Sequence, residues 1–214
     1  MIASAWGEMP VTELEQRIDS IDSSATDDFA ALIRLAGFDP ARDLRFGDFS
    51  KCRFDAQDLH RFDFTGCDLT GADLSQCMLI GAKLSGATLT GAKLGRAVLK
   101  TAVLTRADLS GADLAQAILI DANAADAVFA KASLFQCTAT GLIATGANFA
   151  GADLTNADFS HANLDRANLS GVTLNRTNFH AISEQDARIP SRQGVLPPDP
   201  DRTTSETWFE RTRA

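Results

Sequence analysis

The chain has 214 residues, of which 45% are hydrophobic, and it carries a formal net charge of −8. No apolar run is long enough to span a bilayer, and residues 1–10 contain neither Lys nor Arg nor the apolar core of a signal peptide. The composition therefore argues against a membrane protein and predicts one that stays in the cytoplasm.

Residues 1–41 predict a short α-helical arm. Residues 12–15 have the form of a capping box, and apolar residues follow at helical spacing. A second helix is expected to start at Thr26, to present Phe29 on its apolar face, and to end at Gly37. That face can cover the end of the segment that follows it in the chain, or it can dock a partner.

From Leu44 to Phe179 the sequence repeats every five residues without a change of register. The central residue of each block, written i, is Leu at 18 of 28 positions, Phe at seven and Ala at three. Position i−2 holds Ala 17 times and Cys four times, and the remaining positions are mostly polar. A period of five fits neither a helix nor a strand, and two inward residues per block need stacked coils to bury them. Residues 42–181 are therefore predicted to form a solenoid.

The best-preserved blocks have a familiar motif. Residues 147–171 read ANFAG ADLTN ADFSH ANLDR ANLSG, and residues 67–76 read CDLTG ADLSQ. This resembles the pentapeptide-repeat family, with its motif A-(D/N)-(L/F)-x-x. The resemblance implies an all-β solenoid, a right-handed quadrilateral β-helix with four pentapeptides per coil. The 28 blocks would make about seven coils, and a strand spacing of ~4.8 Å would give a rod roughly 34 Å long.

Residues that could carry chemistry do not assemble into a recognisable site. All four cysteines occupy position i−2, so we interpret each as a small buried hydrophobe. His60, His161 and His180 lie at outward positions, where solvated side chains are expected. Only the last two would share a corner of neighbouring coils, which leaves a metal-dependent surface enzyme as a remote alternative. Asp recurs at i−1, where a short polar side chain suits a tight bend, and no catalytic motif is present. We expect no enzymatic activity, no cofactor and no metal.

Charge bears on a function that the resemblance raises. Some pentapeptide-repeat proteins, of the quinolone-resistance type, bind DNA gyrase and are described as mimics of duplex DNA, which requires an acidic rod. Residues 42–181 carry 14 Asp and no Glu against 13 Lys and Arg, so most of the acidity lies in residues 1–41. The expected function is a non-enzymatic scaffold for protein–protein interaction, without direct binding of nucleic acid. A gyrase-binding DNA mimic is the alternative.

Six apolar residues occupy outward positions, where the core does not need them: Met78, Ile80, Val98, Val103, Ile118 and Ile120. With 20 residues per coil, Met78, Val98 and Ile118 would stack on one face. We predict that this candidate interaction stripe binds a protein partner or a second copy of the chain, as in a homodimer. Alternatively, β-branched side chains there merely stabilise the ladder.

Residues 182–214 predict a mostly disordered C-terminal tail, because they are rich in Pro, Arg, Thr and Asp. The tail contains an adjacent aromatic pair, Trp208 and Phe209, which forms a candidate anchor. The pair can dock a partner, fold back over the last coil, or seal a dimer.

Overall fold

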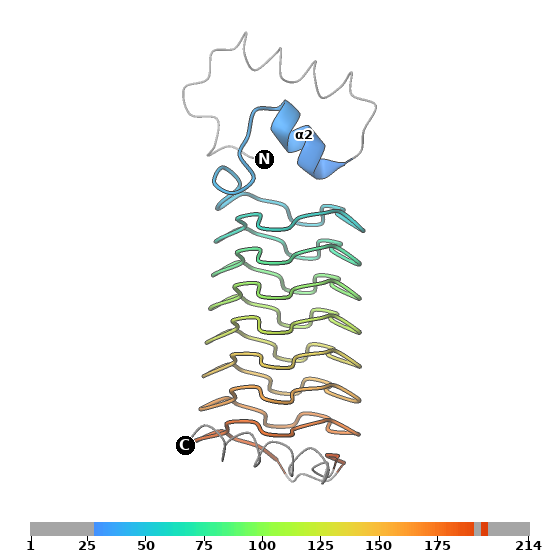
Figure 1. The fold of residues 1–214 in the computed structure, drawn as a ribbon, viewed down its shortest axis with the longest axis vertical. Coiled ribbons are helices and arrows are strands. Elements are labelled where there is room, and N and C mark those ends of the chain that lie inside the picture. The colour runs from blue at the N-terminus through green and yellow to red at the C-terminus, as the bar shows by residue number, and fades with distance from the viewer. Residues whose placement is uncertain (1–27, 191–193, 197–214) are drawn as a thin grey trace, which may run out of the picture.

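The computed structural model describes residues 28–190 and 194–196. They form a straight rod of stacked coils, and the helix α2 (Phe29–Leu35) lies at its N-terminal end (Figure 1). Among the described residues, the ladders consist of single-residue parallel bridges between neighbouring coils, and no extended strand is formed. The shape therefore comes from the stacking of short, frequently bent segments.

Each bridge along the regular part of the rod joins two residues that are 20 apart. The series runs from Asp48–Asp68 to Asn168–Arg188, and the paired residues occupy position i−1 of successive coils. A coil therefore contains four pentapeptides, and each of its four faces carries its own column of outward residues. Any outward side chain has as its column neighbours the residues 20 before and 20 after it.

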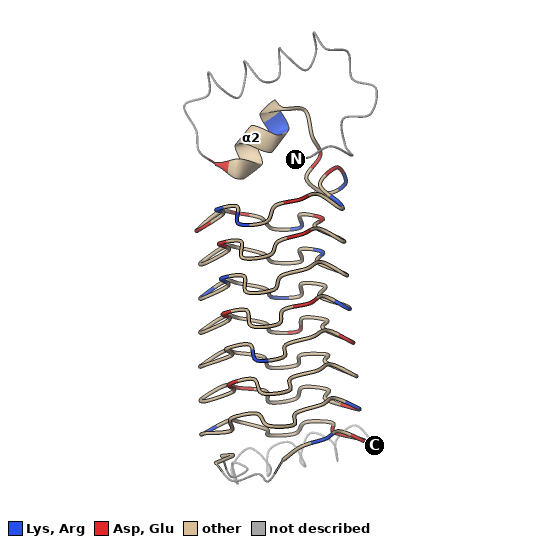
Figure 2. Cartoon of the chain, turned by 180° about the vertical axis from the view of Figure 1, so that it is seen from behind, with Lys and Arg blue, Asp and Glu red and all other residues tan. Residues whose placement is uncertain are grey.

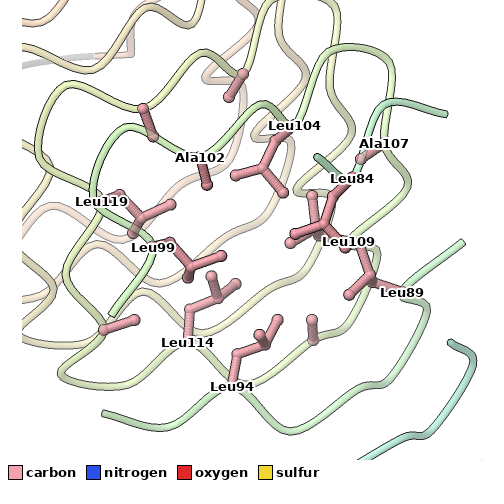
Figure 3. Packing of buried hydrophobic residues seen from close by; sticks show 14 of the residues in the cluster. Leu84, Leu89, Leu94, Leu99, Ala102, Leu104, Ala107, Leu109, Leu114 and Leu119 are labelled. Atoms are coloured by element: carbon pink, nitrogen blue, oxygen red, sulfur yellow. The ribbon is translucent and has the colours of Figure 1, made fainter. Parts of the chain in front are cut away.

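The core is built from the central residues and the small residues at i−2. Leucines of successive coils, such as Leu94 and Leu114, point into the interior of the rod (Figure 3). Both are 0% exposed, and full burial of a leucine side chain contributes about 1.5–3 kcal/mol. The small residue at i−2 lets the chain turn close to this core, which explains why Ala prevails there.

The outward aspartates and asparagines have a structural role in the bends. Asp68 Oδ1 accepts a hydrogen bond from the N–H of Thr70 at 2.9 Å, and Asp153 Oδ1 accepts one from Thr155 at 2.9 Å. The same contact recurs along the rod, from position i−1 to the N–H of i+1. It occupies a backbone donor that the ladder leaves without a partner. Position i+2 then adopts a left-handed conformation, as at Gln76 with φ of 59°.

The helix α2 packs its first residue against the first coil. The ring of Phe29 meets Phe54 edge-on with centroids 4.8 Å apart, and it meets Phe49 at 6.1 Å. The N–H of Phe29 also donates to Gln57 Oε1 at 2.9 Å. The apolar face of the helix thus contacts the end of the core.

The helix begins later than the sequence predicts. Its N-cap is Asp28, whose carboxylate accepts from the N–H groups of Ala30 and Ala31, so Thr26 is not the start. The predicted end is confirmed, because Gly37 follows the helix with φ of 76°. The capping box at residues 12–15 lies outside the described residues.

Ordered ladder extends beyond residue 181, the predicted end of the solenoid. Ser183 and Arg188 continue the series of bridges, and Val195 pairs with Thr177. Glu184 interrupts the apolar series at position i, but Ile189 resumes it in register and packs against the core. Backbone pairing does not need an apolar side chain in every block, so the coil continues past the interruption.

Replacing Phe29 by Ala should destabilise the N-terminal end of the rod by about 2 kcal/mol, because a half-buried aromatic ring is lost. Urea denaturation measures the change. Leu35→Ala is the matched control in the same helix, since Leu35 is 49% exposed and should have little effect. Equal stability of the two variants would contradict a covering role for α2.

Candidate interaction face

Most of the candidate stripe lies on one face of the rod. Bridges join Met78 to Val98 and Val98 to Ile118, so the predicted stacking of these three residues is confirmed. We call this the Met78 face, and its column of outward residues is Asp58, Met78, Val98, Ile118, Thr138, Asp158 and Asn178. Met78 is 46% exposed, whereas Val98 and Ile118 are half-buried.

Two further isoleucines extend the apolar area along the same face. Ile80 and Ile120 each lie two residues after a member of the column, and Lys100 lies in the row between them. Two hydrogen bonds show this order: the N–H of Gly81 donates to the carbonyl of Lys100, and the N–H of Thr101 donates to the carbonyl of Ile120. We call Met78, Ile80, Val98, Ile118 and Ile120 the apolar patch. It spans three successive rows, where a row is the part of one coil that lies on this face.

Val103 lies on the next face, around the corner at Thr101. Its bridge partners are Lys83 and Asn123, so it does not join the apolar patch. The sequence-based stripe therefore combined residues of two faces. The 20-residue register separates them, because it assigns each block of five to one of four faces.

Four other large apolar residues at outward positions lie outside the predicted stripe, although the period of five is enough to find them. They are Phe46, Val128, Phe135 and Ile143, of which Phe46 is 71% exposed and Ile143 is 44% exposed. Val128 is bridged to Asp108 and Asn148, and Ile143 to Asn123 and Asn163, so polar residues flank both. The column of the Met78 face differs from these sites because its three apolar residues, Met78, Val98 and Ile118, follow one another without interruption.

The apolar patch also lacks the hydrogen bonds that close the bends elsewhere. Because Met78, Val98 and Ile118 have no side-chain oxygen, they cannot accept from the N–H groups of Ile80, Lys100 and Ile120. Within the part of the chain that the structure describes, no hydrogen bond from these three N–H groups is found. This hydrogen bond is absent from four successive rows of the Met78 face, from Met78 to Thr138, whereas on the other described faces it is absent from at most two successive rows.

Charged residues surround the patch but do not form a single-sign surface. Nζ of Lys83 lies 3.4 Å from Oδ2 of Asp63, and Nζ of Lys93 lies 3.7 Å from Oδ2 of Asp73. Each pair joins neighbouring coils. Basic and acidic residues are interspersed along the rod (Figure 2). Lys100, in the middle of the patch, forms no ion pair with another of the described residues.

The N-terminal border of the Met78 face is polar. The His60 ring hydrogen-bonds Asp58 through Nδ1 at 2.7 Å, and this contact lowers the pKa of the Asp58 carboxyl below its ordinary range. An ionised carboxylate thus stands directly before Met78 in the column. The apolar patch therefore has a charged edge on this side.

Three of the four cysteines occupy the core, as predicted, and one does not. Cys67, Cys77 and Cys137 are buried, whereas Cys52 is exposed, so the prediction was wrong for Cys52. Cys52 lies in the first coil, where no earlier coil covers position i−2. The thiols of Cys67 and Cys77 donate to backbone carbonyls 23 residues earlier, at 3.0 and 2.7 Å. Burial raises the pKa of each of these two thiols to about 11 and also raises that of Cys137.

Two histidines meet at the C-terminal part of the Met78 face. The rings of His161 and His180 have centroids 5.6 Å apart, which agrees with their predicted position in neighbouring coils. His180 is only 8% exposed, however, so the expectation of a solvated side chain was wrong. Residues 28–190 and 194–196 contain no group of three or more side chains able to hold a metal ion.

Trp208 and Phe209 lie outside the described residues. Among the residues that are described, no helix has the length and hydropathy that crossing a bilayer requires.

The repeat also identifies the relatives of the chain. A family model described as pentapeptide repeats matches residues 48–86, 82–119, 107–141 and 145–180, which together make up more than half of the chain. The chain belongs to the pentapeptide-repeat family. Its coil of four pentapeptides agrees with the four-sided β-helix that the motif implied.

Several solved structures are similar to this pentapeptide-repeat protein. HetL, involved in heterocyst differentiation regulation in the cyanobacterium Nostoc, is 23% identical, with 72% of this chain and 89% of HetL covered and a TM-score of 0.41. Full-length QnrB1, a plasmid-mediated fluoroquinolone resistance protein, is 18% identical, with 79% and 96% covered and a TM-score of 0.44. A thylakoid-lumen protein of Arabidopsis thaliana is 31% identical, with 56% and 69% covered and a TM-score of 0.26. No protein of curated function matches the chain.

The buried thiols make the stability of the rod sensitive to alkaline pH. A thiol pKa raised to about 11 in the fold means that the folded state keeps a proton that the unfolded state releases near pH 9. The stabilisation is complete below that pH and is lost as the pH rises through about 11. We therefore expect the urea midpoint to fall between about pH 8 and pH 11, and to fall less in the variant C67A/C77A.

The difference between the unaltered chain and C67A/C77A reports on these two thiols for two reasons. Ala is the usual residue at position i−2, so the double variant should keep the fold. The chain contains no tyrosine, whose titration would overlap with that of the thiols. An identical pH dependence in both proteins would contradict the assignment to Cys67 and Cys77.

Proposed function

We propose that this protein is a non-enzymatic scaffold that binds a protein partner through the apolar patch on its Met78 face. The observation that carries the proposal is the loss of polar residues in successive rows of this face. Three rows present Met, Val or Ile where the family motif has Asp or Asn. Apolar side chains that gather on the surface of a protein are a common property of interaction sites.

The energetics of the bends support this reading over a purely structural one. A hydrogen bond from the N–H of position i+1 to the side-chain oxygen of position i−1 contributes about 1 kcal/mol, and the three apolar rows lack this bond. Stabilisation of the ladder by β-branched residues does not explain Met78, which is unbranched at Cβ and is the most exposed member of the patch. A binding role explains both the apolar side chains and their continuity.

A cytoplasmic location belongs to the same proposal. All four cysteines are free thiols, and three of them are buried in the core. Free thiols are typical of proteins in a reducing compartment. Self-association through the same patch, as a homodimer, is one form that the proposed binding can take.

The DNA-mimic function is the less supported alternative, because neutral or basic residues interrupt the acidic residues along the columns. Asp68 is followed by Thr88 and Asp108 on one face, and Asp73 by Lys93 and Asp113 on another. Duplex DNA carries a phosphate charge every few ångströms on each strand, and a protein mimic needs a similarly unbroken acidic side. None of the columns in the described residues has one.

We accordingly expect no binding to purified DNA gyrase. Surface plasmon resonance with immobilised gyrase at low salt is the suitable measurement, since low salt favours electrostatic association. Saturable binding to gyrase that weakens steeply as the salt concentration rises would favour the DNA-mimic function over the scaffold function.

The principal test introduces a charge into the patch. Val98→Asp and Ile118→Asp should abolish capture of the partner from the native cell, with at least a tenfold loss of affinity in the purified pair, because a desolvated carboxylate opposes burial. If the partner is a second copy, light scattering should show the change from dimer to monomer.

Val128→Asp is the matched control. Val128 has the same residue type, the same position in the block and a similar half-buried exposure, but it lies on a different face. It should leave both capture and self-association unchanged, and circular dichroism should show that all variants remain folded. Equal losses in Val98→Asp and Val128→Asp, or no loss in either, would defeat the proposal.

A further inference from the structure

The size of the apolar patch limits what it can bind. Three rows at a spacing of ~4.8 Å and two outward positions per row give an area of roughly 15 by 10 Å. This is about 150 Å², whereas a stable interface between two globular proteins buries about 800 Å² on each side. The patch is therefore much smaller than a complete rod-to-rod interface, and its area matches a short peptide segment with one or two large side chains.

The polar groups of the patch define the chemistry of that segment. In rows where Asp or Asn is present, the N–H of position i+1 donates to an outward oxygen, so this N–H faces outward. The N–H groups of Ile80, Lys100 and Ile120 occupy the same position and have no acceptor among the described residues. Together with the ammonium group of Lys100, they favour a segment that places carboxylates beside its apolar side chains.

The chain itself contains a segment with this chemistry. Residues 205–211 read SETWFER, in which Glu206 and Glu210 flank Trp208 and Phe209. Each of the two aromatic side chains offers about 150–250 Å² for burial, so either one is large enough to cover the patch. The two carboxylates complement Lys100 and the three backbone donors.

The course of the chain brings this segment within reach of the patch. Val195 pairs with Thr177, and the N–H of Leu196 donates to the carbonyl of Thr177 at 2.9 Å. In the sequence, Thr177 directly precedes Asn178, which belongs to the column of the Met78 face. The described chain therefore ends at this face, one row beyond Asn178. From there, four row spacings of ~4.8 Å lead back to Ile118 and six lead to Met78, or about 19 and 29 Å.

The intervening sequence is long enough to cover that distance. Trp208 follows Leu196 by 12 residues, and 12 extended residues span about 40 Å. A short tether of this length gives an effective concentration in the millimolar range, so even a weak contact is populated within one molecule. A separate peptide or protein would have to bind much more tightly to occupy the patch to the same extent.

We propose that residues 206–210 dock onto the apolar patch of the same molecule, with Trp208 and Phe209 against Met78, Val98 and Ile118. The docked segment covers the surface that the proposed partner would use, so partner binding requires its displacement. This regulatory consequence rests on the proposed function, whereas the docking itself does not need a partner.

Tryptophan fluorescence tests the docking directly. The chain has two tryptophans, Trp6 and Trp208, so Trp6→Phe leaves Trp208 as the only one. In this variant we expect Trp208 emission to be blue-shifted relative to a peptide of residues 197–214. Acrylamide should quench it about twofold less effectively than it quenches the peptide, because one face of the indole is covered.

Substitutions in the patch then locate the docking site. In the Trp6→Phe background, Met78→Asp and Val98→Asp should each restore the emission and quenching of the free peptide, and Val128→Asp should not. Met78 is 46% exposed, so its replacement leaves the core intact even if Val98→Asp disturbs folding. The signal should be independent of protein concentration.

Three outcomes would overturn the proposal. The first is that acrylamide quenches Trp208 in the full chain as effectively as it does in the peptide. Its protection can survive both patch substitutions, which would place the segment elsewhere. Its protection can also disappear on dilution, which would assign the segment to the patch of a second molecule. Each result is obtained without any partner protein, so it is distinguishable from failure of the proposed function.

Discussion

The backbone hydrogen bonds between coils are the constraint on which the rest of the structure depends. The N–H of Leu69 donates to the carbonyl of Thr88 in the next coil, and the N–H of Asp68 donates to the carbonyl of Gly47 in the previous one. This pairing, repeated along the rod, fixes a register of 20 residues. It turns four separate blocks of five into four faces, each with its own column of side chains.

The same register gives the outward aspartates and asparagines their role. The ladder uses the backbone groups beside each bridge but leaves the N–H of position i+1 without a partner, and the Asp or Asn two residues earlier accepts from it. Their frequency is thus a property of the bend and not of a charged surface. The rows that lack this contact are informative for the same reason, and on the Met78 face they follow one another.

The two ends of the rod differ in what lies against the last coil. A stack of coils leaves apolar side chains and unpaired backbone groups at each end. At the N-terminus, Phe29 of α2 packs against Phe49 and Phe54. At the C-terminus, the ladder continues through Arg188 and then gains the pairing of Val195 with Thr177. That last contact also brings the chain to the Met78 face, which connects the end of the rod with the proposed docking of the tail.

The amino-acid sequence by itself determined the solenoid, its five-residue unit and the inward leucines and alanines, because each depends on the spacing of apolar residues along the chain. The stacking of Met78, Val98 and Ile118 also followed from that spacing once the family resemblance supplied the length of a coil. Only the tertiary structure showed that Cys52 is exposed and that His180 is buried. These properties depend on which face a block occupies and on what covers it, and such neighbours are distant in sequence. The missing hydrogen bonds behind the apolar patch belong to the same class, since the partner of a backbone N–H becomes known only when the bends and the ladder are placed in space.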